Sequence, residues 1–207
     1  TPILFFTSSG MVFQLKCHRL PESAPQALGK PMINLLPINQ DEKINTVMPM
    51  PEDEETWKNL QIIFATQNGN IRKNQLSDFT NIRQNGKIAM KLNEQDELVT
   101  VIPCSDKDNI LLATRLGKAI RFDVNDVRVF VGRGSSGVRG IKLKPNDTVV
   151  SMSLIPNLKN RFILSVTENG FGKRTPIEDY RMTNRGGQGV ANIECSTRNG
   201  PVVSSYV

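Results

Sequence analysis

The feature that most constrains this fold is a fourfold internal repeat with a period of about 50 residues. Each repeat opens with a short apolar run that ends in a turn glycine, at positions 10, 69, 117 and 170. The four runs occupy residues 3–10, 61–69, 109–117 and 161–170. One unit of this size cannot bury its apolar faces alone, so neighbouring units must stack against one another.

Each repeat continues in the same way. A strand that carries a base follows the first glycine, and a polar stretch leads to a second glycine at position 29, 86, 137 or 189. The alternating segments that come next are residues 32–36, 88–92, 138–143 and 190–195. A polar turn then precedes a last apolar strand, such as residues 98–102 or 149–154. The pattern therefore predicts four strands in every repeat.

Period-two alternation favours strand throughout, and no window keeps a helical stripe for three turns; the nearest helical candidate, residues 51–58, is short. The sequence predicts an all-β fold of propeller-like blades in one domain spanning residues 1–207. The approximate repeats are residues 1–52, 53–106, 107–158 and 159–207. Two similar β-sandwiches are the alternative.

Composition indicates a soluble globular chain. Hydrophobic residues make up 38% and charged residues 22%, and no apolar run is long enough to span a bilayer. The chain starts without Met, in the middle of a strand pattern and without an export signal, which suggests a fragment of a longer, non-exported protein. Three widely spaced cysteines indicate reduced thiols in a cytosolic protein and no zinc site.

The charge pattern favours a polyanionic partner. The formal net charge is +6, and residues 105–160 hold ten bases against five acids. Residues 51–59 run the other way, with four acids and one base. We expect this acidic insertion to be an exposed connection that stays away from a polyanion.

Bases recur just after the first turn of each repeat and again near the second glycine. If the blades stack around an axis, equivalent positions reach one rim, and a ring of charge can follow a curved phosphate backbone. Few aromatic residues lie among the bases, which disfavours single-strand binding. A solvated strand end is the alternative for any single base. The predicted DNA-binding residues are Lys16, Arg72, Lys73, Arg83, Lys87, Lys118, Arg121, Arg133, Arg139, Lys173, Arg174 and Arg185.

Other chemistry has little support in the sequence. Residues 132–137 match G-x-G-x-x-G, but an alternating strand follows where a dinucleotide site needs a helix. This loop fits a phosphate contact or a tight turn. The only histidine, His18, lacks a partner set, and Asp96, Glu97 and Asp147 lie at turns, where carboxylates bind backbone amides. We therefore predict no catalytic residues, no metal site and no cofactor in this chain.

Several segments resemble the carboxy-terminal domain of bacterial DNA gyrase A, in the type IIA topoisomerase family. They read GKAIRF, GVRGIKL and TENGFGKRTP at residues 117–122, 137–143 and 167–176. Residues 6–10, 20–22, 33–37 and 197–203 match the same family in the same order. The resemblance implies a β-pinwheel, whose blades exchange strands, that wraps duplex DNA around a basic rim and supports negative supercoiling.

The resemblance also implies partners. They are the amino-terminal cleavage domain of gyrase A, which carries the DNA-cleaving tyrosine, and gyrase B, the ATPase component, in an A2B2 holoenzyme that uses ATP and Mg2+. The expected location is the bacterial cytoplasm, at the nucleoid and away from membranes. The equivalent domain of topoisomerase IV and a protein-scaffolding β-propeller are the alternatives.

Two departures from the family pattern stand out. The family's Gln-Arg-Arg-Gly-Gly-Lys-Gly type box belongs to its first blade, and nothing before Gly29 matches it. A box-like sequence, RGGQG, occurs instead at residues 185–189 in the last repeat. The family has five or six blades, so we expect this chain to hold only part of the domain.

Overall fold

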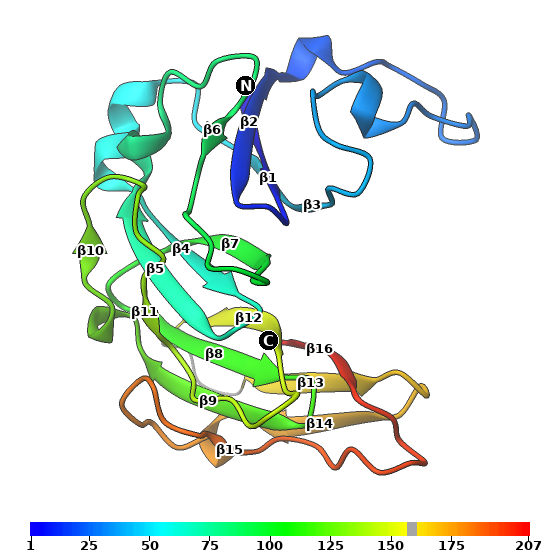
Figure 1. Ribbon diagram of the computed structural model, residues 1–207, viewed down its shortest axis with the longest axis vertical. Helices are drawn as coiled ribbons and strands as arrows, with labels where there is room; N and C mark the ends of the chain where they lie inside the picture. Colours follow the sequence, from blue (N-terminus) through cyan, green and yellow to red (C-terminus); the bar gives the residue numbers. More distant parts are fainter. Residues whose placement is uncertain (157–160) are drawn as a thin grey trace.

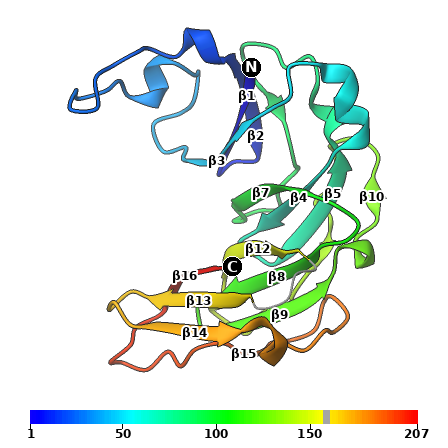
Figure 2. The ribbon, with the colours of Figure 1, turned by 180° about the vertical axis from the view of Figure 1, so that it is seen from behind.

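The computed structural model describes residues 1–156 and 161–207, which form four small β-sheets along an open arc (Figures 1 and 2). These residues form strands and short 3₁₀ helices and no α-helix, which confirms the all-β prediction. The expected repeat boundary between residues 158 and 159 lies outside the described residues. The acidic insertion contains a 3₁₀ helix.

Each sheet is built around a hairpin and the last strand of the same repeat. The first sheet, in the order β3-β1-β2-β6, contains β1 (Pro2–Thr7), β2 (Met11–Lys16), β3 (Ile44–Pro49) and β6 (Lys87–Ile88). The second, β10-β5-β4-β7 with β11 also on β5, contains β4 (Gln61–Thr66), β5 (Asn70–Gln75), β7 (Leu98–Cys104), β10 (Val129–Phe130) and β11 (Val138–Arg139).

The other two sheets follow the same plan. The third, β12-β8-β9-β15, contains β8 (Asn109–Thr114), β9 (Lys118–Asp123), β12 (Val149–Ile155) and β15 (Val190–Ala191). The fourth, β14-β13-β16, contains β13 (Phe162–Thr167), β14 (Gly172–Pro176) and β16 (Val202–Tyr206). The 3₁₀ helices are η1 (Cys17–Arg19), η2 (Met32–Asn34), η3 (Glu54–Asn59), η4 (Leu76–Phe79), η5 (Val124–Asp126) and η6 (Ile177–Asp179).

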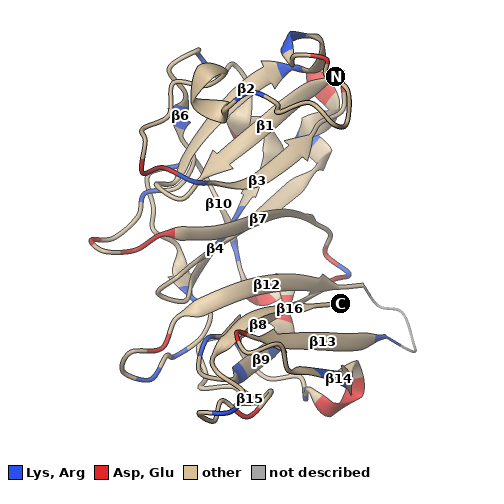
Figure 3. Ribbon diagram, turned by 90° about the vertical axis from the view of Figure 1, so that its right-hand side faces the viewer, with Lys and Arg blue, Asp and Glu red and all other residues tan. Residues whose placement is uncertain are grey.

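The sheets exchange strands along the arc. β6, β11 and β15 each pair antiparallel with the second hairpin strand of the preceding repeat, respectively β2, β5 and β9. We call the edge that carries β6, β10, β11 and β15 the outer edge. The opposite, inner edge consists of β3, β7, β12 and β16, which follow one another in Figure 3.

The prediction of a full third strand in every repeat was wrong. Each exchanged strand pairs over only two residues, and residues 32–36 contain η2 instead of a strand. Burial does not alternate over residues 88–92: Ala89 and Met90 are consecutive and both buried, and both of their amides donate to the Gly10 carbonyl of the preceding repeat. The alternating sequence therefore predicted a ladder that the backbone does not continue beyond Ile88.

The core lies in the seams between successive sheets. Alternate residues of one first strand pack against the next first strand, because side chains in a strand point to opposite faces. Leu4 and Phe6 thus contact the cluster that contains Ile62 and Phe64. The same arrangement joins β4 to β8 and β8 to β13. The first strands β1, β4 and β8 are therefore buried on both faces, which explains their continuous apolar runs, whereas β13 leaves Phe162 and Leu164 exposed on one face.

Carboxylates fasten the hairpin turns, as the sequence predicted for Asp96 and Asp147. The Asp96 carboxylate accepts from Thr66 Oγ1 at 2.7 Å and from the Asn68 amide at 2.9 Å, and Asp147 accepts from the Leu116 amide at 2.9 Å. Glu97 contributes its own amide to Asp96. These bonds tie the turns before β7 and β12 to the hairpins of their own repeats.

We expect Asp96→Ala to lower the free energy of unfolding by about 2–4 kcal/mol, because it leaves the buried Thr66 hydroxyl and two amides of the turns without their acceptor. Asp96 is 8% exposed, whereas Glu94, in the same turn, is exposed. Glu94→Ala is the matched control and should change stability by about 0.5 kcal/mol at most. Urea unfolding followed by circular dichroism measures both, and equal effects would contradict the role given to Asp96.

Candidate nucleic-acid interface

The strand exchange brings bases to the outer edge of the seams between sheets. A loop containing an arginine precedes each exchanged strand: Arg83 before β6, Arg133 before β11 and Arg185 before β15. Since each exchanged strand lies on the preceding sheet, these loops cross from one repeat to another. The second group of predicted bases therefore lies at the seams.

Three of these bases gather at the first seam. The Lys87 ammonium donates to the Thr80 carbonyl at 2.8 Å, and Arg133 Nη1 donates to the Ile88 carbonyl at 3.1 Å. Burial lowers the pKa of Lys87, and the positive charges of Arg133 and Arg83 lower it further. Mutual repulsion among cations is relieved when an anion binds, so this cluster fits a phosphate group.

The next seam carries Arg139 and Arg185. Arg185 Nη1 donates to the Arg139 carbonyl at 3.1 Å, and its Nε donates to the Asp126 carbonyl at 2.9 Å. The Gly186 amide donates to the Gly140 carbonyl at 2.6 Å, so the box-like segment docks on the preceding repeat. The Arg139 side chain is exposed.

Two predicted contacts are buried, which removes them from the DNA-facing set. Arg72 is 0% exposed and Lys73 is 3% exposed. Arg72 donates to backbone carbonyls in the loop before β11, while Lys73 Nζ lies 3.4 Å from the Val124 carbonyl and 3.7 Å from Asp106 Oδ1. The sequence analysis placed both bases at the DNA-binding rim, but neighbouring elements cover both faces of β5.

Arg121 is also engaged inside the protein. Its guanidinium donates to Asn109 Oδ1 at 2.9 and 3.1 Å and to the Ile177 carbonyl at 3.1 Å. Burial lowers its pKa. Arg121 therefore joins β9 to the segment that contains η6, and most of its donors are already used.

The remaining predicted bases lie apart from these clusters. Lys118 is half-buried, whereas Lys16, Lys173 and Arg174 are exposed. Lys173 Nζ lies 3.3 Å from the Asn192 carbonyl, and the Arg174 guanidinium lies 4.6 Å from the centre of the Phe162 ring. The bases in the loops before the exchanged strands thus lie close together, whereas the bases of the hairpins do not form a cluster.

Sequence reasoning missed three exposed arginines near the 3₁₀ helices. Arg19 belongs to η1, while Arg128 and Arg181 each stand two residues after the last residue of η5 or η6. A recurring Asp-x-Arg pattern at Asp126 and Asp179 was the signal available in the sequence. Arg181 lines a depression of about 380 Å³ together with Arg121 and the glycines of residues 187–189.

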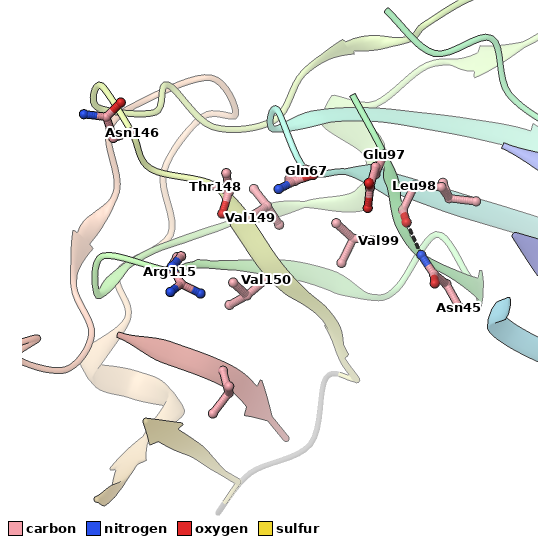
Figure 4. A pocket seen from close by; sticks show the side chains of 11 residues that line it. Asn45, Gln67, Glu97, Leu98, Val99, Arg115, Asn146, Thr148, Val149 and Val150 are labelled. Carbon is pink, nitrogen blue, oxygen red and sulfur yellow. Dashed lines mark hydrogen bonds between the residues drawn. The ribbon is translucent and has the colours of Figure 1, made fainter. Parts of the chain in front are cut away.

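The inner edge has a different character (Figure 4). Side chains from four repeats line an open depression of about 690 Å³ there, including Asn45, Glu97, Arg115 and Val203. Asn45 Nδ2 donates to the Leu98 carbonyl, and Arg115 lies 3.8 Å from Glu168. The lining contains one acid, Glu97, and one base, Arg115, so this depression carries no excess of positive charge and is a poor match for phosphate.

Within residues 1–156 and 161–207, no helix is long and apolar enough to cross a membrane. The same part of the chain contains no group of three or more His, Cys, Asp or Glu residues placed to hold a metal ion.

Comparison with known proteins supports the family resemblance. The family described as "DNA gyrase C-terminal domain, beta-propeller" matches residues 1–49, 61–105, 108–156 and 161–200. The chain belongs to this family. The DNA gyrase A protein of Rickettsia bellii is 41% identical over 249 residues, covering 98% of this chain and 28% of the relative. The gyrase A protein of Staphylococcus epidermidis is 39% identical over 203 residues, covering 97% of this chain and 22% of the relative.

Solved structures agree on the fold. The C-terminal domain of DNA topoisomerase IV matches with a TM-score of 0.88 at 28% identity, covering 99% of this chain and 62% of that one. A DNA gyrase A C-terminal domain matches with a TM-score of 0.79 at 24% identity, covering 99% and 64%, and supports the fold alone. This chain thus spans about a quarter of these two curated relatives and under two thirds of these two solved domains.

Proposed function

We propose that this chain binds and wraps duplex DNA along its outer edge, with little preference for base sequence. The observation that carries the proposal is the cluster of Arg83, Lys87 and Arg133, which two repeats build together at one seam. Arg139 and Arg185 extend the positive charge to the next seam. Phosphate contacts spaced along an arc favour bent DNA and read its shape and deformability.

The larger assembly follows from the family. In this proposal, the chain acts within DNA gyrase A, beside the amino-terminal cleavage domain and together with gyrase B in an A2B2 holoenzyme, in the bacterial cytoplasm. ATP and Mg2+ act elsewhere in that holoenzyme. Wrapping by this chain would give the captured duplex the hand needed for negative supercoiling.

The salt dependence of binding tests the outer edge. Arg83→Ala combined with Arg139→Ala removes two exposed charges. We expect weaker binding to random-sequence duplex and a log–log salt slope smaller by about 1–2, because each lost phosphate contact releases about 0.9 fewer counterions. Fluorescence anisotropy at several salt concentrations measures both quantities.

The matched control replaces Lys43 and Lys144 by Ala. Both residues are exposed. Lys43 immediately precedes the inner-edge strand β3, and Lys144 precedes the turn that leads to the inner-edge strand β12. We expect the control to keep most of the affinity and the parent slope. Equal losses in the two double variants would refute the outer-edge assignment, and no DNA binding by the parent would favour the protein-scaffolding alternative.

The equivalent role in topoisomerase IV is a second candidate, favoured by the TM-score of 0.88 with that enzyme's C-terminal domain. A reconstituted holoenzyme containing this chain separates the two roles. Introduction of negative supercoils into relaxed plasmid supports gyrase, whereas relaxation alone supports topoisomerase IV.

A further inference from the structure

A fully buried guanidinium on β5 is bound mainly by backbone carbonyls. Arg72 donates to the carbonyls of Arg133 at 2.9 Å and Ser135 at 2.7 Å, and also to the Ala89 carbonyl. Its Nε donates to Asn74 Oδ1 at 2.7 Å. One side chain of the second repeat therefore holds the loop before β11, which belongs to the third repeat.

Asn74 completes the arrangement from the same strand. Its Nδ2 donates to the Gly132 carbonyl at 2.7 Å and to the Phe130 carbonyl at 3.0 Å, and it also contacts Asp78 Oδ2 at 2.8 Å. Arg72 and Asn74 together bind four carbonyls within residues 130–136. We call this arrangement the carbonyl clamp.

Burial of the Arg72 charge costs desolvation free energy, which offsets part of what the carbonyl clamp contributes to stability. Burial lowers the pKa of Arg72 to about 10, so the side chain stays protonated at neutral pH. The Phe64 ring, 5.0 Å from the guanidinium carbon, and the carbonyls offset part of the desolvation cost. An apolar side chain of similar size would avoid that cost but would leave the carbonyls of Arg133, Ser135 and Ala89 without this donor. The clamp's distinctive property is therefore the conformation that it gives the loop.

The clamped loop carries a base of the outer edge. Residues 130–136 include Gly132 and Gly134, at neither of which an added Cβ would meet an atom within 4 Å. Such a loop has few packing contacts of its own to fix its shape. Arg133, between these glycines, nonetheless reaches back to the Ile88 carbonyl beside Lys87.

We infer that Arg72 is a positioning residue for DNA binding, which acts by holding the 130–136 loop so that Arg133 joins the phosphate-binding cluster. The inference rests on the proposed DNA binding. Arg72 itself does not touch DNA. Its removal should act through Arg133, whereas loss of a purely structural residue should weaken binding whether or not Arg133 is present.

A double-mutant cycle tests this dependence with Arg72→Lys, Arg133→Ala and the combined variant. Lysine keeps the positive charge but cannot reproduce the forked set of bonds. We expect each single variant to weaken binding to random-sequence duplex about fivefold, and the combined variant to bind about as tightly as Arg133→Ala. Hydrogen exchange should accelerate at the amides of residues 131–136 in Arg72→Lys and stay unchanged in β8.

Ile163→Val serves as the stability control, since Ile163 is fully buried in the fourth sheet and its shortening destabilises without touching the loop. Its effect on affinity should be the same with and without Arg133. If Arg72→Lys fails to fold, Asn74→Ala releases two of the carbonyls while keeping Arg72, and the same cycle applies.

The outcomes separate the inference from the proposed function. Additive losses in the cycle, or unchanged exchange at residues 131–136, overturn the positioning role while DNA binding stands. Absence of DNA binding by the parent chain overturns the proposed function, and with it the role of Arg72 in that function. Unchanged binding in Arg133→Ala overturns the positioning role by showing that the loop carries no contact.

Discussion

Gly137→Ala is expected to destabilise the chain by about 3 kcal/mol or more and to abolish tight DNA binding. Gly137 has a φ of +82°, in the left-handed region, and an added Cβ would overlap the Ile71 carbonyl oxygen and lie 3.0 Å from the Cβ of Arg72. Both neighbours belong to β5, on which β11 pairs through Val138. The backbone must therefore shift, and the exchanged strand loses its register.

Gly134→Ala is the matched control in the same loop. Gly134 has an ordinary φ, and an added Cβ would meet no atom within 4 Å. We expect a stability change of about 0.5 kcal/mol at most and parent-like DNA affinity. Urea unfolding and anisotropy measure both variants. Similar behaviour of the two would mean that the close approach of Gly137 to β5 is not what fixes the seam.

The repeat pattern predicted the hairpins well because both signals are local. An apolar run marks a strand buried on both faces, and a glycine marks a turn with positive φ, as at Gly10, Gly69 and Gly117. Strand exchange involves partners about 70 residues apart, such as Val138 and Ile71, and a two-residue pairing leaves almost no periodicity. Only the family resemblance implied it, and the pairings of β6, β11 and β15 confirm it.

The candidate site shows why base positions were harder to predict than strands. Arg72 follows the turn glycine Gly69, and Arg83 precedes the turn glycine Gly86. Nothing in their local sequence indicates that Arg72 is buried and Arg83 is exposed. The difference arises because a loop of the next repeat covers Arg72. Burial of a charge by a distant segment is a tertiary effect that a single sequence does not encode locally.

The acidic insertion was predicted as an exposed connection, and the structure divides it into two faces. Glu52, Asp53 and Glu55 are exposed, and Asp53 accepts from the Glu55 amide at 3.0 Å at the start of η3. Trp57, the only tryptophan in the chain, is 0% exposed and belongs to the core between the first two sheets. A lone tryptophan among acids was the signal for this anchor.

Trp57→Ala should therefore lower the free energy of unfolding by about 3–5 kcal/mol, the cost of emptying a large buried site. It also removes the bond from Trp57 Nε1 to the Pro51 carbonyl, 3.1 Å long. Trp57→Phe should cost less because it keeps most of the apolar contact, while Glu55→Ser on the exposed face should cost about 0.5 kcal/mol at most. Urea unfolding followed by circular dichroism ranks the three. A Trp57→Ala loss no larger than that of Glu55→Ser would show that η3 does not fasten the first sheet to the second.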